Sequence, residues 1–447
     1  MDTQIKTYTY PNGDIQRVQT VRLSDWSALS FLEPPASPGA LDRFAGIYRD
    51  FLVPAAPWLF GNMILFRLPK YLTVDFPVET KQYGTLADPL TAAAAALKDG
   101  VRIVSGAPVF RNAAVRAFWQ ILEEQDCVRI VSGKLPVTTI IPLGDLAGYL
   151  TEAEKDASLK VNASFFIMHR CDCATVYDHV GTAFGLSVTD GLVTRPPLYH
   201  REALLVRNNG SVSVENLDVR DLTIEIRGVS LIHGKNARVY TRPKAFRSPP
   251  GKKQALVIIG NRVAAVGNGS LPVPASGFVL CPDVPIPVSP GDAVCYRGLE
   301  DVTFGIQVGN SILRNGIPTL EFRSRFYNIR HLQPIPYPPS LYPMDFAHAR
   351  AARIALGADK DGKPILLWAE GAAKFGYVPG ESSCGASLAE MAAICADAGM
   401  VNAVNLDGGG SAQILIHNER SLRISDRAAA DHSEAERPVP LGLIVRE

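Results

Sequence analysis

The stretch from Gly385 to Ile416, GASLAEMAAICADAGMVNAVNLDGGGSAQILI, carries the signals that decide the fold of the second half of the chain. It opens with Ser387-Leu388-Ala389-Glu390, a capping box in which the serine hydroxyl and the glutamate carboxylate satisfy opposite backbone donors of a first helical turn. We therefore predict a helix that Gly399 ends, followed by a buried strand over 401–406 and a second strand over 412–416. The buried stripe of this helix is predicted to consist of Leu388, Met391, Ala392, Cys395 and Ala398.

Hairpin signals recur along the chain before this stretch. Each is an Asn-Gly or Asp-Gly pair between apolar runs, which is typical of tight antiparallel turns. These pairs are Asp190-Gly191, Asn209-Gly210, Asn315-Gly316 and Asp361-Gly362. We predict an α+β protein with strand-rich mixed and antiparallel sheets and a few packed helices.

The first 125 residues differ in sequence pattern from the rest of the chain. They mix proline-rich turns with two predicted helices, over 90–97 and 112–124. We interpret residues 1–125 as an N-terminal α/β appendage of unknown role, and residues 126–447 as the main domain. The segment from about 204 to 300 reads almost wholly as strand and turn, and we interpret it as a strand-rich insertion.

Composition excludes some classes of protein. The 447 residues carry 45 basic and 44 acidic side chains, a net charge of +1, so the chain lacks the basic field of a nucleic-acid binder. The longest uncharged apolar stretch, 51–66, contains two prolines and a glycine and makes a poor membrane span. The N-terminus has no signal-peptide pattern. We expect a cytoplasmic protein, although a mature secreted form would look similar.

The seven cysteines are an odd number and read as mostly free thiols. One cluster, His169-Arg170-Cys171-Asp172-Cys173 with His179 nearby, contains metal-ligand side chains. Its Cys-x-Cys spacing is not that of structural zinc sites. We favour a loop that lines or flanks a cleft. A metal held by His169, Cys171, Cys173 and His179 stays as the weaker alternative, and no cofactor is expected.

The glycine run Asp407-Gly408-Gly409-Gly410-Ser411 follows directly on the buried strand. Three glycines weaken a sheet, but they allow close approach of the backbone or positive φ angles. Their amide groups can point at an anion beside the Asp407 carboxylate. A tight hairpin explains the glycines equally well. A Walker-type phosphate loop is not supported, since no Gly-Lys-Ser/Thr follows.

The sequence 385–416 resembles the core of the phosphodiester glycosidase family. The resemblance continues upstream in Arg353-Ile354-Ala355-Leu356-Gly357, in Leu366-Leu367-Trp368-Ala369-Glu370-Gly371 and in Val161-Asn162-Ala163-Ser164-Phe165-Phe166, and downstream in Glu436-Arg437-Pro438-Val439-Pro440. It covers roughly residues 136–446 and is strongest after 350. Three positions depart from the family pattern: Ile354 replaces Thr, Glu370 replaces Asp, and Ser164 stands near a usual Gly.

The resemblance implies hydrolysis of the C1–O bond of a sugar-1-phosphodiester, such as an N-acetylglucosamine-1-phosphodiester. Its phosphate leaving group calls for cationic partners, and its C1 calls for a nearby carboxylate. On that basis the predicted catalytic residues are Asp407, Glu370 and Arg353. The predicted substrate-binding residues are Gly408, Gly409, Gly410, Ser411, Asn162, Arg437 and His348.

Each residue also has a structural interpretation. Arg353 can pair with a buried acid as scaffold, and Arg437 has Asp431, Glu434 and Glu436 beside it. Asn162 can hold a loop instead of a sugar hydroxyl. Two other functions stay open: a non-catalytic sugar-phosphate or glycan-binding protein on the same scaffold, and a hydrolase of ordinary glycosides. The expected partner is a small-molecule or glycan phosphodiester, and the sequence leaves the oligomeric state open.

Overall fold

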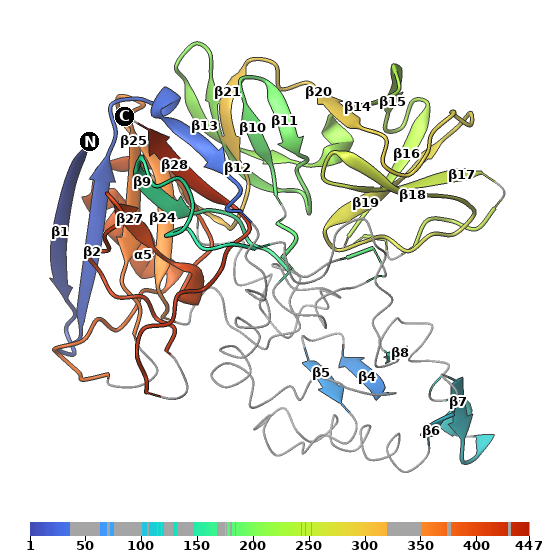
Figure 1. Ribbon diagram of the computed structural model, residues 1–447, viewed down its shortest axis with the longest axis horizontal. Helices are drawn as coiled ribbons and strands as arrows, with labels where there is room; N and C mark the ends of the chain where they lie inside the picture. The colour runs from blue at the N-terminus through green and yellow to red at the C-terminus, as the bar shows by residue number, and fades with distance from the viewer. Residues whose placement is uncertain are drawn as a thin grey trace.

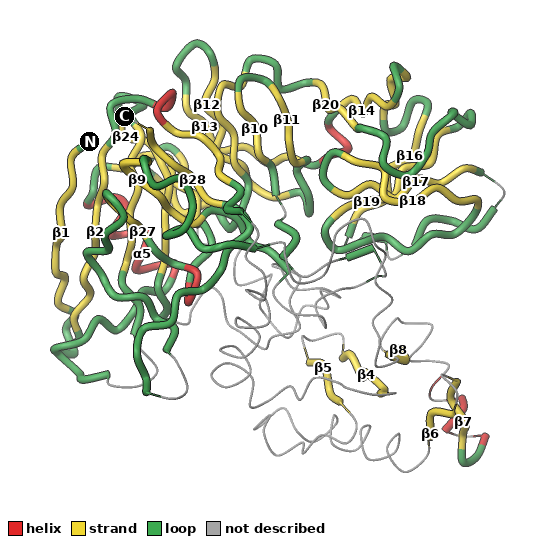
Figure 2. The backbone as a smooth tube through the Cα atoms, in the orientation of Figure 1, coloured by secondary structure: helices red, strands yellow, loops and turns green. Residues whose placement is uncertain are grey.

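The computed structural model is built largely from strands (Figures 1 and 2). The strand-rich α+β class predicted from the sequence is confirmed. Among the described residues, none of the helices has the length and apolar character needed to cross a membrane. The structure describes residues 1–35, 63–68, 72–75, 101–104, 107–113, 115–117, 119, 128–131, 147–167, 175, 177–178, 181–183, 185–242, 244–245, 247–251, 253–319, 350–372, 377–427 and 431–446.

The sheet that positions the site has seven strands, all paired antiparallel. Three of its central strands carry continuous buried runs, because both faces of the sheet are covered. Its order is β1-β2-β25-β24-β26-β22-β23. The strands are β1 (Asp2–Thr9), β2 (Ile15–Arg22), β22 (Ser311–Arg314), β23 (Ile317–Pro318), β24 (Arg353–Asp359), β25 (Pro364–Ala369) and β26 (Met400–Asn405).

One face of this sheet is covered by α5 (Leu388–Asp397), the helix predicted from the capping box. Both reciprocal bonds of the box are present: the Ser387 hydroxyl accepts from the Glu390 N–H, and the Glu390 carboxylate accepts from the Ser387 N–H. The predicted stripe is buried, and Gly399, with φ of +86°, ends the helix. The predicted helix and both of its end signals are confirmed.

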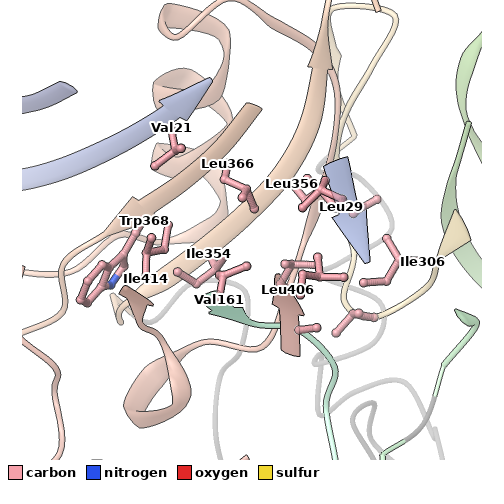
Figure 3. Close-up of a cluster of buried hydrophobic side chains, with 14 of the residues drawn as sticks. Val21, Leu29, Val161, Ile306, Ile354, Leu356, Leu366, Trp368, Leu406 and Ile414 are labelled. Carbon is pink, nitrogen blue, oxygen red and sulfur yellow. The ribbon is translucent and has the colours of Figure 1, made fainter. Parts of the chain in front are cut away.

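The other face packs on a four-stranded sheet of order β27-β9-β28-β3. Figure 3 shows the apolar core between them, in which Ile354, Leu356 and Leu366 meet Val161 and Ile414. The second sheet consists of β3 (Leu29–Leu32), β9 (Ala157–Asn162), β27 (Ile414–Ile416) and β28 (Gly442–Arg446). The glycine run joins β26 in the first sheet to β27 in the second, so it spans one end of this sandwich.

The first 32 residues complete both sheets. Val18 pairs with Ala369 across β2 and β25, and Leu29 pairs with Val445 across β3 and β28. In Figure 1 the blue β1 and β2 lie beside the late strands β24 and β25. The division predicted at residue 125 therefore does not separate these three strands from the main domain.

The segment predicted as a strand-rich insertion consists mainly of strands and turns. Its first strands, β12 and β13, belong to a five-stranded sheet of order β11-β10-β21-β12-β13. A three-stranded sheet (β15-β14-β20) and a four-stranded sheet (β16-β19-β17-β18) follow. Their strands are β10 (Ser187–Thr189), β11 (Leu192–Arg195), β12 (Arg201–Arg207), β13 (Val212–Leu217), β14 (Thr223–Ile226), β15 (Val229–Ile232), β16 (Ala237–Thr241), β17 (Gln254–Ile259), β18 (Arg262–Asn268), β19 (Gly277–Pro282), β20 (Val294–Arg297) and β21 (Val302–Ile306).

All four predicted hairpins are confirmed, as β10–β11, β12–β13, β22–β23 and β24–β25. Between residues 36 and 146 the structure gives β4 (Met63–Leu68), β5 (Leu72–Asp75), β6 (Val101–Val104), β7 (Ala107–Phe110) and β8 (Val128–Val131). Part of the helix predicted over 112–124 is present, at 113, 115–117 and 119. The helix predicted over 90–97 lies outside the described residues.

Candidate functional site

Three predicted site residues lie at the same end of three neighbouring strands. In the antiparallel order β25-β24-β26, Glu370 follows the last residue of β25, Arg353 is the first residue of β24, and Asp407 follows β26 by two residues. The register carries past the end of β26, because the Leu406 N–H donates to the Ile354 carbonyl at 2.9 Å. Residues 17 to 54 positions apart in the sequence are thus brought within a few strand spacings, each about 4.8 Å.

The glycine run forms a single 3-10 turn, η6 (Gly409–Ser411), with its own steric demands. Gly409 has φ of +57°, and a Cβ there would meet none of the described atoms within 4 Å. At Gly408 and Gly410, by contrast, a Cβ would lie 2.6 Å from the Ala352 carbonyl oxygen and 2.2 Å from the side chains of Asp426 and Arg437. Glycine is therefore required here for close packing at two positions and for backbone conformation at one.

The amide groups of this turn do not behave as predicted. The Gly408 N–H donates to Oδ1 of Asp407 at 2.9 Å, and the Gly409 N–H donates to the Ala352 carbonyl at 2.8 Å. An anion would have to displace one of these protein acceptors to reach either amide. The prediction that the Gly408 and Gly409 amides are presented to an anion is therefore wrong, because the turn uses them to fix itself to Asp407 and β24. At these two glycines, positive charge for an anion therefore does not come from the backbone amides.

Asp407 is a buried carboxyl group, 7% exposed. Burial raises the pKa of Asp407 from 3.8 to about 6, against the lowering effects of the Ser411 hydroxyl, the Arg437 charge and the Gly408 N–H. Within the described part of the chain, its Oδ2 atom has no hydrogen-bond partner. A buried acceptor without a partner is costly, and such groups gather at sites that bind something. Within the described residues, Asp407 therefore offers one carboxylate oxygen without a partner.

Asn162 clamps the two ends of the turn. Its Nδ2 donates to the Asp407 carbonyl at 2.7 Å, and its Oδ1 accepts from the Gln413 N–H at 2.9 Å. The predicted alternative of a loop-holding residue is the one that these contacts support. A sugar hydroxyl would have to compete with two backbone groups for the buried amide of Asn162.

Arg437 lies against the turn, as predicted, but its acidic partner differs from the three considered from the sequence. Its Nε donates to Oδ2 of Asp426 at 2.9 Å and its Nη2 to Oδ1 at 3.1 Å, a fork of the kind that guanidinium groups make with carboxylates. Both side chains are buried. The remaining nitrogen, Nη1, lies 3.4 Å from the Ser411 hydroxyl oxygen. Asp426 is therefore a site residue that the sequence analysis missed.

The three acids considered as partners of Arg437 bind elsewhere. Glu436 accepts from the Thr151 hydroxyl, Glu434 from the Ile424 N–H at 3.4 Å, and Asp431 from the Ser433 N–H. Proximity in sequence suggested them, yet Asp426, eleven residues upstream, is the partner of Arg437 because the intervening segment folds back on the turn.

Arg353 is buried, and its Nε donates to the Ala386 carbonyl at 3.0 Å, just before the N-cap of α5. This contact fixes the guanidinium on the α5 side of the sheet. Because Arg353 stands beside Asp407 in the strand register, it places a second cation at this end of the sheet.

Glu370 is buried with both carboxylate oxygens engaged. Oε1 accepts from the Arg423 N–H at 2.8 Å, while Oε2 accepts from the Ser383 hydroxyl and from Arg17 at 3.4 Å. The glutamate thus ties β25 to β2 and to the segment that leads to Asp426. These contacts give Glu370 the geometry of a residue that positions the site.

The remaining predicted positions lie outside the described residues. These are His348 and the metal candidates His169, Cys171, Cys173 and His179. Among the cysteines that the structure describes, Cys281, Cys295, Cys384 and Cys395 are free thiols, as expected for these four.

Comparison with known proteins identifies the second half of the chain. Residues 236–446 match the model of the phosphodiester glycosidase family. A stretch of 102 residues, 23% of this chain, is 32% identical to mouse (Mus musculus) N-acetylglucosamine-1-phosphodiester α-N-acetylglucosaminidase. It spans only 18% of the length of that protein. The region that matches the family model, 236–446, contains Arg353, Glu370, Asp407 and Arg437, whereas Asn162 precedes it.

Two solved structures also align with the chain. A hypothetical protein from Synechocystis aligns with a TM-score of 0.42 at 16% identity, covering 99% of this chain and 62% of its own. The zebrafish N-acetylglucosamine-1-phosphodiester α-N-acetylglucosaminidase catalytic domain, auto-inhibited by pro-peptide, aligns with a TM-score of 0.40 at 13% identity. That alignment covers 100% of this chain and 82% of the zebrafish chain.

Proposed function

Because residues 236–446 match the phosphodiester glycosidase family, we propose that this chain hydrolyses the bond between C1 of a sugar and the bridging oxygen of a sugar-1-phosphodiester. Water supplies the oxygen that joins C1, and the phosphate monoester departs with the electrons of the broken bond. Such a leaving group needs less protonation than a sugar alcohol and more positive charge around it. The site has to supply a carboxylate for C1 and cations for the phosphate.

The observation that carries the proposal is the state of Asp407. Its carboxyl group is buried, has a pKa raised to about 6, and keeps Oδ2 without a partner in the described part of the chain. A carboxylate with this pKa is ionised at neutral pH yet basic enough to accept a proton from water. It is also placed to stabilise positive charge that develops at C1.

The two arginines supply the cationic side. Arg437 reaches the turn through Ser411, and Arg353 stands beside Asp407 on the neighbouring strand. Burial strengthens the attraction of these charges for a phosphate, because less water screens them. At Gly409 none of the described atoms lies within 4 Å of the position of a Cβ, which is where we propose that a ligand approaches the backbone.

The test is hydrolysis of a panel of sugar-1-phosphodiesters, with N-acetylglucosamine-1-phosphodiester first, by wild type and by Asp407→Asn. We expect release of free sugar by wild type and a loss of about 10²-fold or more in the variant. A matched control is Asp218→Asn, which removes the charge of a buried aspartate in the ion pair with Arg220. Equal turnover by wild type and Asp407→Asn would contradict the assignment of Asp407.

A second candidate is a protein that binds a sugar phosphate without cleaving it. It is favoured by Glu370, whose two oxygens are both engaged by protein donors, because glycoside hydrolysis generally uses two carboxyl groups. Saturable binding of a sugar-1-phosphodiester by wild type with no release of sugar would support this candidate and exclude the first. An ordinary nitrophenyl glycoside, compared with its phosphodiester counterpart, tests whether the phosphate is required.

A further inference from the structure

Asp426 has no role in the proposed reaction, yet its carboxylate forms a two-pronged, buried ion pair with Arg437 beside the glycine turn. Its two oxygens take Nε and Nη2 of Arg437, so the guanidinium plane is fixed in two directions. Nη1 lies 3.4 Å from the Ser411 hydroxyl oxygen. The clamp therefore decides which part of Arg437 faces the turn.

The clamp is built directly against the turn. A Cβ on Gly410 would lie 2.2 Å from both Oδ1 of Asp426 and Nη2 of Arg437, so the ion pair packs against the bare Cα of this residue. Protein interiors are close-packed, and a pair held in this way cannot shift without moving the backbone of the turn. Asp426, Arg437 and the segment 407–411 thus form one rigid unit.

The direction of the hydrogen bonds follows from the chemistry of the groups. A guanidinium can only donate, so the Ser411 oxygen accepts from Nη1 of Arg437. The Ser411 proton is then turned away from Arg437. The Ser411 hydroxyl lowers the pKa of the Asp407 carboxyl, although the two groups do not meet the strict criteria for a hydrogen bond.

We propose that Asp426 is a positioning residue for the proposed reaction: it aims Nη1 of Arg437 at Ser411, and Ser411 in turn directs its hydroxyl proton toward Asp407. This role rests on the proposed function for its catalytic consequence, which is an Asp407 that stays ionised to lower pH. Hydrogen bonds join Asp426 to Arg437 and Arg437 to Ser411, and the proposed step from Ser411 to Asp407 completes the sequence.

Two effects of Asp426 on Asp407 have opposite signs, and this makes the proposal testable. As a nearby negative charge, Asp426 raises the pKa of Asp407, so removing only its charge lowers that pKa. As the anchor of Arg437, it supports the ionised form of Asp407, so losing the anchor raises the pKa. Among the described residues, Arg437 also acts on Asp407, Arg353 begins the neighbouring strand β24, and Glu370 lies one strand further away.

The experiment measures the pKa of Asp407 by NMR titration of protein labelled with ¹³C at aspartate carboxyl carbons. The Asp407 signal is identified by its absence from Asp407→Asn. In Asp426→Asn, one of the two acceptor oxygens is replaced by an amide that cannot accept from Arg437. We expect the pKa of Asp407 to rise by about half a pH unit or more. A fall, or no change, overturns the positioning role, because charge alone would then account for Asp426.

A second variant keeps the proposal testable if Asp426→Asn folds poorly. Ser411→Ala removes only the hydroxyl, and we expect the pKa of Asp407 to rise; an unchanged pKa overturns the role of Ser411. In the Ser411→Ala background, Asp426→Asn should no longer raise the pKa, because the path is already broken. Asp218→Asn is the matched control and should leave the pKa of Asp407 unchanged.

The NMR readout needs no substrate, so it separates this proposal from the proposed function. If wild type releases no sugar but Asp426→Asn raises the pKa of Asp407, the positioning role holds and the proposed reaction fails. If sugar is released, the acidic limb of kcat/KM against pH should move upward in Asp426→Asn together with the NMR value.

Discussion

Replacing Asp407 by asparagine should stabilise the protein at neutral pH. Burial raises the pKa of this carboxyl group from 3.8 to about 6, so the folded protein holds the proton more tightly than the unfolded chain. Below pH 4 both states are protonated and the group costs nothing. As the pH rises from about 4 to about 6, Asp407 ionises in the unfolded chain before it ionises in the folded protein. The folded protein therefore loses stability over this range, and above pH 6 the loss is complete.

The magnitude follows from the two pKa values. The difference is about two pKa units, and each unit corresponds to about 1.4 kcal/mol. Ionised Asp407 should therefore cost up to about 3 kcal/mol of unfolding free energy above pH 6. Asparagine keeps a carbonyl oxygen for the Gly408 N–H and does not ionise, so Asp407→Asn avoids this cost.

The assay is urea unfolding of wild type and Asp407→Asn at a series of pH values from 4 to 8. Other carboxyl groups titrate alike in both proteins, so the difference between the two free energies isolates Asp407. We expect a difference near zero at pH 4 that grows in favour of the variant up to pH 6 and then levels off.

A control with the opposite sign is available. The pKa of Asp397 is lowered, chiefly by hydrogen bonds from Lys6 and Tyr8, so ionised Asp397 stabilises the folded wild type. Relative to wild type, Asp397→Asn should therefore become less stable as the pH rises. If Asp407→Asn matches wild type from pH 4 to 8, or is the less stable protein at pH 8, Asp407 is an ordinary scaffold carboxylate. The physical basis of its catalytic assignment would then be gone.

Four further substitutions test the construction of the site, with urea unfolding as the measurement. Gly410→Ala should destabilise by about 3 kcal/mol or more, because its Cβ would overlap the Asp426–Arg437 pair; a cost under 1 kcal/mol would mean that this pair moves freely. A Cβ at Gly409 meets none of the described atoms, so Gly409→Ala should cost only the positive-φ strain of about 1–2 kcal/mol and is the matched control for Gly410→Ala. Asn162→Ala should cost about 2–4 kcal/mol, since it leaves the Asp407 carbonyl and the Gln413 N–H unpaired, and an undisturbed stability would show that water replaces the clamp. Ser387→Ala should cost about 1 kcal/mol through the lost cap of α5 without changing activity.

The elements that the sequence predicted well are those with a local cause. Asn315-Gly316 fixes a two-residue hairpin through backbone angles alone, and Ser387 with Glu390 starts a helix through bonds within one turn. Arg353, Glu370 and Asp407 meet at one end of the sheet because neighbouring antiparallel strands bring a strand start beside two strand ends.

The features that could not be predicted from the sequence depend on pairings between distant segments of the chain. Strand β2 reads as an ordinary strand, and nothing in its residues names β25, some 350 positions away, as its neighbour. The partner of Arg437 was missed for a similar reason: Asp426 lies in a polar segment among several acids, and only the folded path shows which one reaches the guanidinium. An acid two residues after the buried Ile424 was the one available signal.

The glycine run shows how one pattern supports two functions at once. Its amides serve the turn itself, so the protein gives up a backbone anion site at Gly408 and Gly409. The absent side chains instead let an ion pair approach the backbone at Gly410, where a Cβ would be 2.2 Å from both charged groups. A guanidinium held this way reaches Asp407 through Ser411 without forming a direct ion pair with it. A direct pair would hold the pKa of Asp407 low and occupy Oδ2, so the indirect contact is what leaves a basic carboxylate oxygen free beside a cation.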